Sequence, residues 1–183
     1  CSGFLYGLGL ADSLIKSGQY KTILVVGAET LSRIIDYRDR ETCILFGDGA
    51  GAFVVGRAVG ESEGLLSFHL AADGTLGDSL TLAGPGRARA ENEKTDGPFV
   101  QMRGREIFRS AVKAMSERCR EALAANGCKI EDIDWFVPHQ ANVRIIEAVG
   151  KQLEIDPQRV ISNLERVGNT SSASIPLALD EAI

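Results

Sequence analysis

Two spacings of apolar residues alternate along this chain of 183 residues. In the first, an apolar residue recurs every three or four positions, which is typical of a helix with one buried face. The predicted helices cover residues 2–16, 106–125 and 143–153, and a last one follows residue 169. In the second, short runs are almost wholly apolar, as in strands of a sheet covered on both faces. The predicted strands cover residues 22–28, 45–55, 65–72, 135–137 and 159–161, and their alternation with helices predicts an α/β fold.

Composition and charge narrow the class of protein. Hydrophobic residues make up 44% and charged residues 25%, which is ordinary for a soluble globular protein, and no apolar run approaches the ~20 residues of a membrane span. The net charge of −5 argues against a general attraction to nucleic acid, so an acidic partner would need a local basic patch. The cysteines are Cys1, Cys43, Cys119 and Cys128. Their wide spacing, without a CxxC pair, predicts reduced thiols in a cytosolic protein and neither a zinc site nor a disulfide framework.

Three residues stand where they could share one reaction centre. Cys1 opens the first predicted helix, where the positive end of the helix dipole favours a thiolate that can accept an acyl group. His139 follows the apolar run at 135–137, and Asn169 lies in a Gly-Asn-Thr-Ser turn before the last helix. A neutral imidazole N–H and a side-chain amide are both hydrogen-bond donors, so together they could stabilise an enolate. Because Cys1 and Asn169 each precede an apolar helix, two similar halves would aim both residues at one centre.

Two other segments predict local structure from their own composition. The sequence FGDGAG at 46–51 lacks the Lys-Ser/Thr pair and the following helix of a phosphate-binding loop. It predicts a tight turn packed near the active centre and capped or braced by Asp48. Residues 73–98 are rich in Gly, Thr, Asp and Arg, which predicts a long surface excursion. The chain has no initiating Met and ends inside an apolar segment without a helix-ending signal, so we expect an internal stretch of a longer chain.

Five motifs together resemble a known family. They are CSGF at 1–4, LVVGAE at 24–29, RDRETCILFGDGAGAFVV at 38–55, VPHQANVRI at 137–145 and RVGNTSSASIPLALDEA at 166–182. They look like β-ketoacyl-acyl-carrier-protein synthase III, a thiolase-fold condensing enzyme, and HQAN with GNTS after a helix-opening Cys is highly specific. The resemblance implies a five-layered αβαβα fold of two related halves. Residues 1–60 would end the N-terminal half, and residues 61–183 would form most of the C-terminal half, truncated before its last strands.

The resemblance also implies a reaction and the residues that perform it. Cys1 would be acylated by an acyl-CoA primer. His139 and Asn169 would stabilise the enolate formed when a malonyl group on acyl carrier protein loses CO₂, and the carbanion would attack the acyl-Cys1. This decarboxylative Claisen condensation would start fatty acid synthesis, and it implies no metal or redox cofactor.

Further residues match family positions around this centre. The residues implied to bind the acyl-CoA are Arg40, against the adenine, and Leu31 and Phe46, in the acyl pocket. The residues expected to dock the acyl carrier protein are Arg109, Arg144 and Lys151. Arg105 replaces a small polar residue often found in the pantetheine tunnel, which changes the local contacts expected there. The family further implies a cytoplasmic homodimer that binds neither nucleic acid nor membranes.

Other functions share some of these features. A papain-like cysteine protease also combines Cys, His and Asn, but its signature around the Cys is absent here. An N-terminal-nucleophile hydrolase would use the α-amine of Cys1 as base, but its nucleophile begins a strand and not a helix. Another thiolase-fold condensing enzyme or acyltransferase would carry the same three residues. A catalytically inert fragment is a further alternative, since part of the active-site wall would lie outside this chain.

Overall fold

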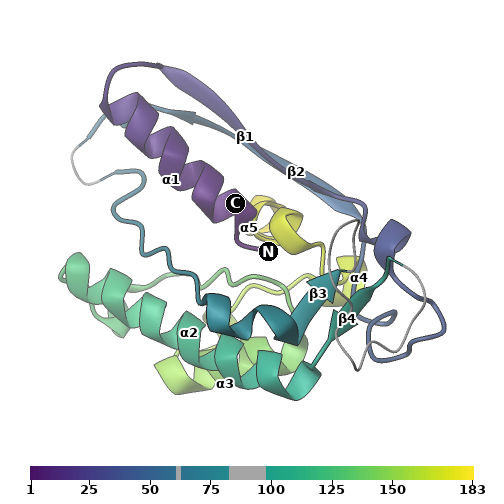
Figure 1. Ribbon diagram of the computed structural model, residues 1–183. Helices are drawn as coiled ribbons and strands as arrows, with labels where there is room; N and C mark the ends of the chain where they lie inside the picture. The colour runs from purple at the N-terminus through teal and green to yellow at the C-terminus, as the bar shows by residue number, and fades with distance from the viewer. Residues whose placement is uncertain (61–62, 83–97) are drawn as a thin grey trace.

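The computed structural model describes residues 1–60, 63–82 and 98–183 (Figure 1). Its first part is a helix, α1 (Gly3–Lys16), followed by the strands β1 (Thr22–Glu29) and β2 (Gly49–Gly56). The strands form an antiparallel ladder in which Thr22 lies opposite Gly56 and Glu29 lies opposite Gly49. The helix and both strands were expected from their apolar spacing. The bounds of α1 and β1 lie within one residue of the predicted ones, while β2 begins at Gly49 and not at the predicted residue 45.

The helix α1 covers one face of the β1–β2 ladder. Phe4 and Ala11 of α1 and Val25 of β1 form a buried cluster, and the rings of Phe4 and Phe53 meet edge to face with centroids 5.8 Å apart. The glycines of α1 allow this approach, since a Cβ at Gly7 would lie 3.0 Å from Val25. The opposite face of the ladder exposes apolar side chains, among them Leu24, Val26 and Val54. The prediction that both faces are covered therefore holds for only one face within the described residues.

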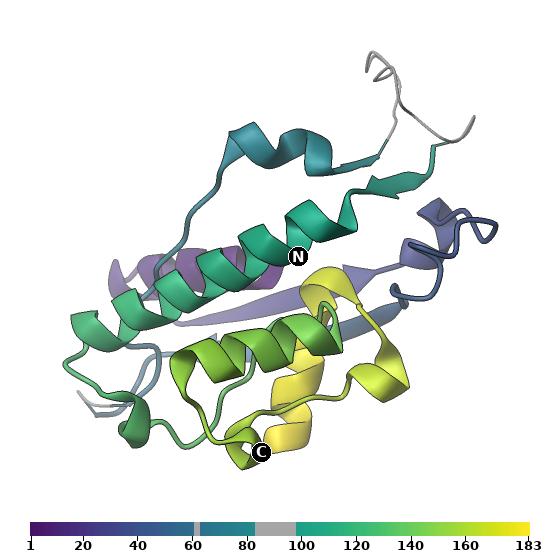
Figure 2. The same ribbon diagram turned by 90° about the horizontal axis from the view of Figure 1, so that it is seen from below.

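Two further helices form a second layer. They are α2 (Gly104–Ala125) and α3 (Val143–Leu153), which lie side by side in Figure 2. Ile145, Val149, Leu153 and Ile155 are buried, and α2 packs the apolar stripe from Phe108 to Cys119 against them. The predicted apolar faces of both helices are thus the faces that meet.

The short strand predictions were wrong. Residues 65–72 form no strand, and 135–137 and 159–161 form only a single parallel bridge between Phe136 and Val160. An apolar run becomes a strand only where a second backbone satisfies its N–H and C=O groups, and here the pairing ends after one residue on each side. A two-stranded antiparallel ladder that the sequence did not suggest joins β3 (Leu80–Leu82) to β4 (Val100–Met102). The described part of the predicted excursion at 73–98 thus carries β3 and a short helix, while residues 83–97 lie outside the described residues.

The remaining elements are short, and most connect the longer ones. The 3-10 helices are η1 (Leu31–Ile34), η2 (Gly74–Ser79), η3 (Ile130–Asp132), η4 (Pro157–Arg159) and η5 (Ser171–Ala173). Near the C-terminus, α4 (Leu164–Val167) precedes Asn169. The last helix, α5 (Ser174–Ala182), packs against β2 of the β1–β2 ladder (Figure 1). Asn169 therefore does not open the last helix directly, because the single turn η5 stands between them. No helix among the described residues is both long and apolar enough to cross a membrane.

Candidate active site

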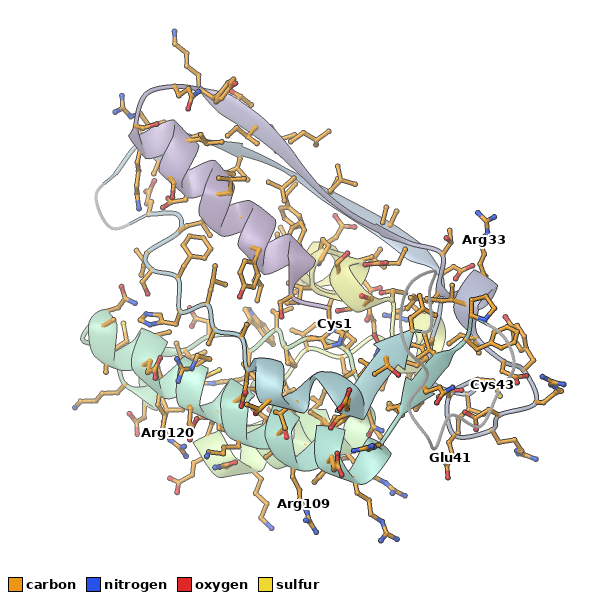
Figure 3. All side chains as sticks on the ribbon, viewed as in Figure 1. Cys1, Arg33, Glu41, Cys43, Arg109 and Arg120 are labelled. Atoms are coloured by element: carbon orange, nitrogen blue, oxygen red, sulfur yellow. The ribbon has the colours of Figure 1, made fainter. Side chains whose placement is uncertain are left out.

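Cys1, His139 and Asn169 line one cavity of about 1300 Å³. Cys1 immediately precedes the first turn of α1, where it is exposed. His139 lies between the Phe136–Val160 bridge and α3, and Asn169 follows α4. Figure 3 shows Cys1 between the β1–β2 ladder, with α1 and α5 packed on it, and the layer formed by α2 and α3. Residues from both ends of the chain therefore converge, as the sequence predicted.

Cys1 lies at the positive end of the α1 dipole. Ser2 occupies the N-cap position, and its backbone oxygen accepts a hydrogen bond of 3.0 Å from the Tyr6 N–H. The Ser2 side chain makes no cap hydrogen bond, so it does not occupy the N–H groups of the first turn. A negative charge close to this end of a helix is favoured by the dipole.

His139 is neutral at physiological pH. Burial lowers the pKa of its imidazole to about 4. Its Nδ1 lies 2.6 Å from the hydroxyl of Ser174, which is fully buried at the start of α5. The same Ser174 oxygen accepts a hydrogen bond of 3.3 Å from the backbone N–H of Gln140. We therefore assign the Ser174 hydroxyl as the donor to Nδ1, which leaves the ring proton on Nε2 as a donor.

Asn169 is held on three sides. Its backbone N–H donates to the Leu45 carbonyl at 2.8 Å, and its own carbonyl accepts from the Gly47 N–H at 3.0 Å. Its side-chain oxygen accepts a hydrogen bond of 2.9 Å from the Ser171 N–H. Because the amide oxygen is engaged in this way, the side chain presents its NH₂ group as the donor at the cavity.

The Gly-rich segment at 46–51, which leads into β2, packs directly against this asparagine. A Cβ at Gly47 would lie 2.2 Å from the Val167 carbonyl oxygen, so only glycine allows this close approach. The Asp48 carboxylate accepts hydrogen bonds from the Ser32 N–H at 2.8 Å and the Ser32 hydroxyl at 2.5 Å. The prediction that this segment packs near the centre is confirmed, but the prediction of a tight turn was wrong, because residues 49–51 already belong to β2. Asp48 braces Ser32 of η1 and not its own segment.

Gln140 and Asn142 follow His139 in the sequence and fix the backbone around it. Asn142 lines the cavity and Gln140 does not. Gln140 is fully buried, and its side-chain NH₂ donates to the carbonyls of Pro138 and Ile161 at 2.8 and 3.2 Å. Asn142 caps α3 by accepting a hydrogen bond of 2.8 Å from the Arg144 N–H. These contacts fix the backbone on both sides of His139 and determine where α3 begins.

The predicted acyl-CoA residues are only partly brought together. Phe46 lines the cavity and forms a parallel bridge with Asn169. Arg40 is exposed and Leu31 begins η1, and neither lines the cavity, although the neighbours of Arg40 in the sequence do. Contacts of Arg40 and Leu31 with a substrate therefore stay predictions.

The predicted docking residues lie on two neighbouring helices. Arg109 of α2 and Arg144 of α3 are exposed and also line the cavity, and Arg105 lines it as well. Figure 3 shows the side chain of Arg109 extending outward from α2. Lys151 is exposed in the last turn of α3 but does not line the cavity. The three docking positions are therefore accessible to a partner, two of them at the cavity itself.

Comparisons with known proteins identify the family of this chain. Residues 1–74 match the family model of 3-oxoacyl-[acyl-carrier-protein] synthase III, and residues 123–183 match the model of the C-terminal part of the same family. The chain superposes on the solved 3-oxoacyl-[acyl-carrier-protein] synthase III of Aquifex aeolicus with a TM-score of 0.88 and 48% identity, covering 100% of this chain and 55% of that one. The corresponding synthase of Thermus thermophilus gives a TM-score of 0.91 and 47% identity, covering 100% of this chain and 56% of that one.

These neighbours place the fold among the thiolase-fold condensing enzymes. Two curated relatives are each 50% identical to this chain, over 100% of this chain and 56% of their own length. They are the β-ketoacyl-[acyl-carrier-protein] synthases III of Alkalilimnicola ehrlichii and Xanthomonas campestris. Within that class, the chain belongs to the β-ketoacyl-acyl-carrier-protein synthase III family. It spans about half the length of these curated relatives.

Proposed function

We propose that this chain carries the reaction centre of an enzyme that condenses an acyl-CoA primer with malonyl-acyl-carrier protein. The Cys1 thiolate attacks the acyl-CoA thioester, and coenzyme A leaves as its thiolate, which takes up a proton from solvent. The malonyl thioester then loses CO₂, and the electron pair of the broken C–C bond forms an enolate whose oxygen accepts hydrogen bonds from His139 and Asn169. The enolate carbon attacks the acyl-Cys1 carbonyl and releases the Cys1 thiolate, which gives a β-ketoacyl-carrier protein.

The observation that carries this proposal is that a thiol and two side-chain donors, Cys1, His139 and Asn169, line one cavity. With the Ser174 hydroxyl assigned as the donor to Nδ1, the His139 proton lies on Nε2, and the Ser171 N–H leaves the Asn169 amide NH₂ as the donor. Two neutral donors suit an oxyanion that forms only during decarboxylation. In a cysteine protease the same His nitrogen would have to accept a proton, which this tautomer does not favour.

The proposed reaction also implies which substrates, cofactors and cellular location the enzyme would have. Its substrates would be an acyl-CoA and malonyl-acyl-carrier protein, and its chemistry would use the thiol, imidazole and amide without a metal or redox cofactor. We expect a cytoplasmic homodimer that binds neither nucleic acid nor membranes. The four free cysteines, of which three are half-buried and Cys1 is exposed, suit a reducing compartment.

A reconstitution with defined substrates tests this function. The full-length protein is mixed with acyl-CoAs of different chain length and with malonyl-acyl-carrier protein, and the masses of protein and product are measured. We expect an acyl adduct on the protein with at least one primer, followed by a β-ketoacyl-carrier protein two carbons longer than that primer. An adduct that water releases without condensation would indicate an acyltransferase or hydrolase of the same fold.

The basic residues at the cavity give a prediction about the partner. The chain is acidic overall, with a net charge of −5, so an acidic carrier protein must be attracted locally. We expect Arg144→Glu to lower kcat/KM for malonyl-acyl-carrier protein on the order of tenfold, at the lower end of electrostatic steering effects. Transfer from acyl-CoA to Cys1 should change by less than about twofold, since that step does not involve the carrier.

Lys21→Glu is the matched control, because it makes the same charge change at an exposed position at the start of β1. It should leave both substrates unaffected. Added salt should reproduce part of the Arg144→Glu loss, since exposed charges are screened beyond about 8–10 Å. An equal loss with malonyl-CoA and with malonyl-acyl-carrier protein would mean that Arg144 supports the fold of the site and does not dock the carrier.

A further inference from the structure

The turn that orients Asn169 adopts an unfavourable backbone conformation. Ser171, whose N–H binds the Asn169 side-chain oxygen, has φ of 50°. A residue with a Cβ in this left-handed region costs about 1–2 kcal/mol relative to a right-handed conformation. Such a conformation persists only when the surrounding structure holds it. The orientation of the Asn169 amide therefore depends on whatever secures the Ser171–Ser172 segment.

Glu29 supplies this support from 143 residues away in the sequence. One of its carboxylate oxygens accepts hydrogen bonds from the Ser172 N–H at 3.1 Å and the Ser172 hydroxyl at 2.5 Å. The Ser171 hydroxyl also contacts this carboxylate. Burial raises the pKa of Glu29, but the hydrogen bonds from Ser172 and Ser171 outweigh it, so the pKa is lowered and the group is ionised. Charge-assisted hydrogen bonds of this kind are stronger than neutral ones.

The strand that carries Glu29 lies directly against the same turn. A Cβ at Gly27, two residues earlier in β1, would lie 2.6 Å from the Ser172 carbonyl oxygen. Glu29 itself closes the β1–β2 ladder opposite Gly49, so its backbone is held by strand pairing. The carboxylate therefore acts from a fixed position, while Glu29 does not line the cavity.

We propose that Glu29 is a positioning residue for the decarboxylation step. Its carboxylate holds Ser172 and Ser171, the Ser171 N–H holds the Asn169 side-chain oxygen, and the Asn169 NH₂ is thereby aimed at the enolate. This role rests on the proposed function of Asn169 and deepens it. Because Cys1 is not part of this chain of hydrogen bonds, we expect acylation of the thiol to depend little on Glu29.

Replacement of Glu29 by its amide isostere tests the proposal. In the full-length protein, Glu29→Gln keeps the shape of the side chain but removes the charge and turns one acceptor into a donor. We expect malonyl thioester decarboxylation to fall on the order of tenfold, since a misdirected oxyanion donor loses part of the 10²–10³ that such a donor supplies. Acylation of Cys1 by acyl-CoA, measured from the intact mass, should stay within about twofold.

Asp73→Asn is the matched control. The Asp73 carboxylate also accepts from a following residue's N–H and hydroxyl, those of Thr75, at 3.0 and 2.6 Å, but it lies before η2 and outside the cavity lining. It should leave both steps unchanged. An Asp73→Asn loss of decarboxylation equal to that of Glu29→Gln would contradict a specific role for Glu29.

A second substitution separates positioning from general stability. Glycine adopts positive φ without strain, so Ser171→Gly keeps the N–H that binds Asn169 while it removes the cost that Glu29 offsets. We expect Ser171→Gly to restore decarboxylation several-fold in the Glu29→Gln background, which a purely structural role in β1 would not allow. No rescue, or an equal fall of acylation and decarboxylation in Glu29→Gln, overturns the proposal.

The outcome for the unsubstituted protein distinguishes this proposal from the one on which it rests. Unsubstituted protein that fails to decarboxylate malonyl thioesters overturns the proposed function, and the role of Glu29 with it. Unsubstituted protein that decarboxylates them as fast as Glu29→Gln does overturns the role of Glu29 alone.

Discussion

Cys1→Ala should abolish formation of the acyl-enzyme. Cys1 is the exposed cysteine, it stands at the start of α1, and its side chain lines the cavity with His139 and Asn169. Without the thiol there is no nucleophile to accept the acyl group, so condensation should fall by several orders of magnitude. The measurement is the intact mass of the protein after mixing with acyl-CoA, which should show no adduct.

The other thiols provide a control for this result. Burial raises the pKa of the Cys119 thiol, which makes it a poor nucleophile at neutral pH. Cys128 is half-buried beyond the end of α2, with its sulfur 3.5 Å from the Asn126 carbonyl oxygen. Cys128→Ala should therefore acylate as the unsubstituted protein does. An acyl mass that persists in Cys1→Ala would remove Cys1 from the mechanism.

His139→Ala and Asn169→Ala should each lower malonyl decarboxylation by about 10²–10³-fold, because each removes one donor to the enolate oxygen. Acylation of Cys1 should fall far less, since these donors serve the second substrate. The two losses should not add, because both donors stabilise the same oxygen. The rates of CO₂ release and of adduct formation, measured separately, give the comparison.

The protonation state of His139 refines this prediction. With a pKa of about 4, the imidazole is neutral above about pH 5, so its contribution should not vary between pH 6 and 8. His69→Ala is the control, since His69 contacts Ser67 at 3.1 Å and does not line the cavity. If His139→Ala lost acylation and decarboxylation equally, His139 would instead be acting as a base for Cys1.

The periodicity of apolar residues was sufficient to predict the longer helices. One face of α2 is buried against one face of α3, so apolar residues recur every three or four positions in both sequences. The bounds of α3 were predicted to the residue, since Asn142 caps it and the apolar pattern stops at Leu153. The short apolar runs at 65–72, 135–137 and 159–161 carried no comparable information, because strand formation depends on a partner that is distant in the sequence.

For the candidate site, the sequence by itself determined which chemical groups are available and in what local context. CSGF, HQAN and GNTS indicated a thiol at a helix start and two neutral donors. Only the tertiary structure decided how these groups are oriented. The Ser174 hydroxyl that directs the His139 proton lies 35 residues away, and the Glu29 carboxylate lies 143 residues from Ser172. No periodicity or motif spacing encodes such pairs, because hydrogen bonds between distant segments arise only when packing brings their backbones together.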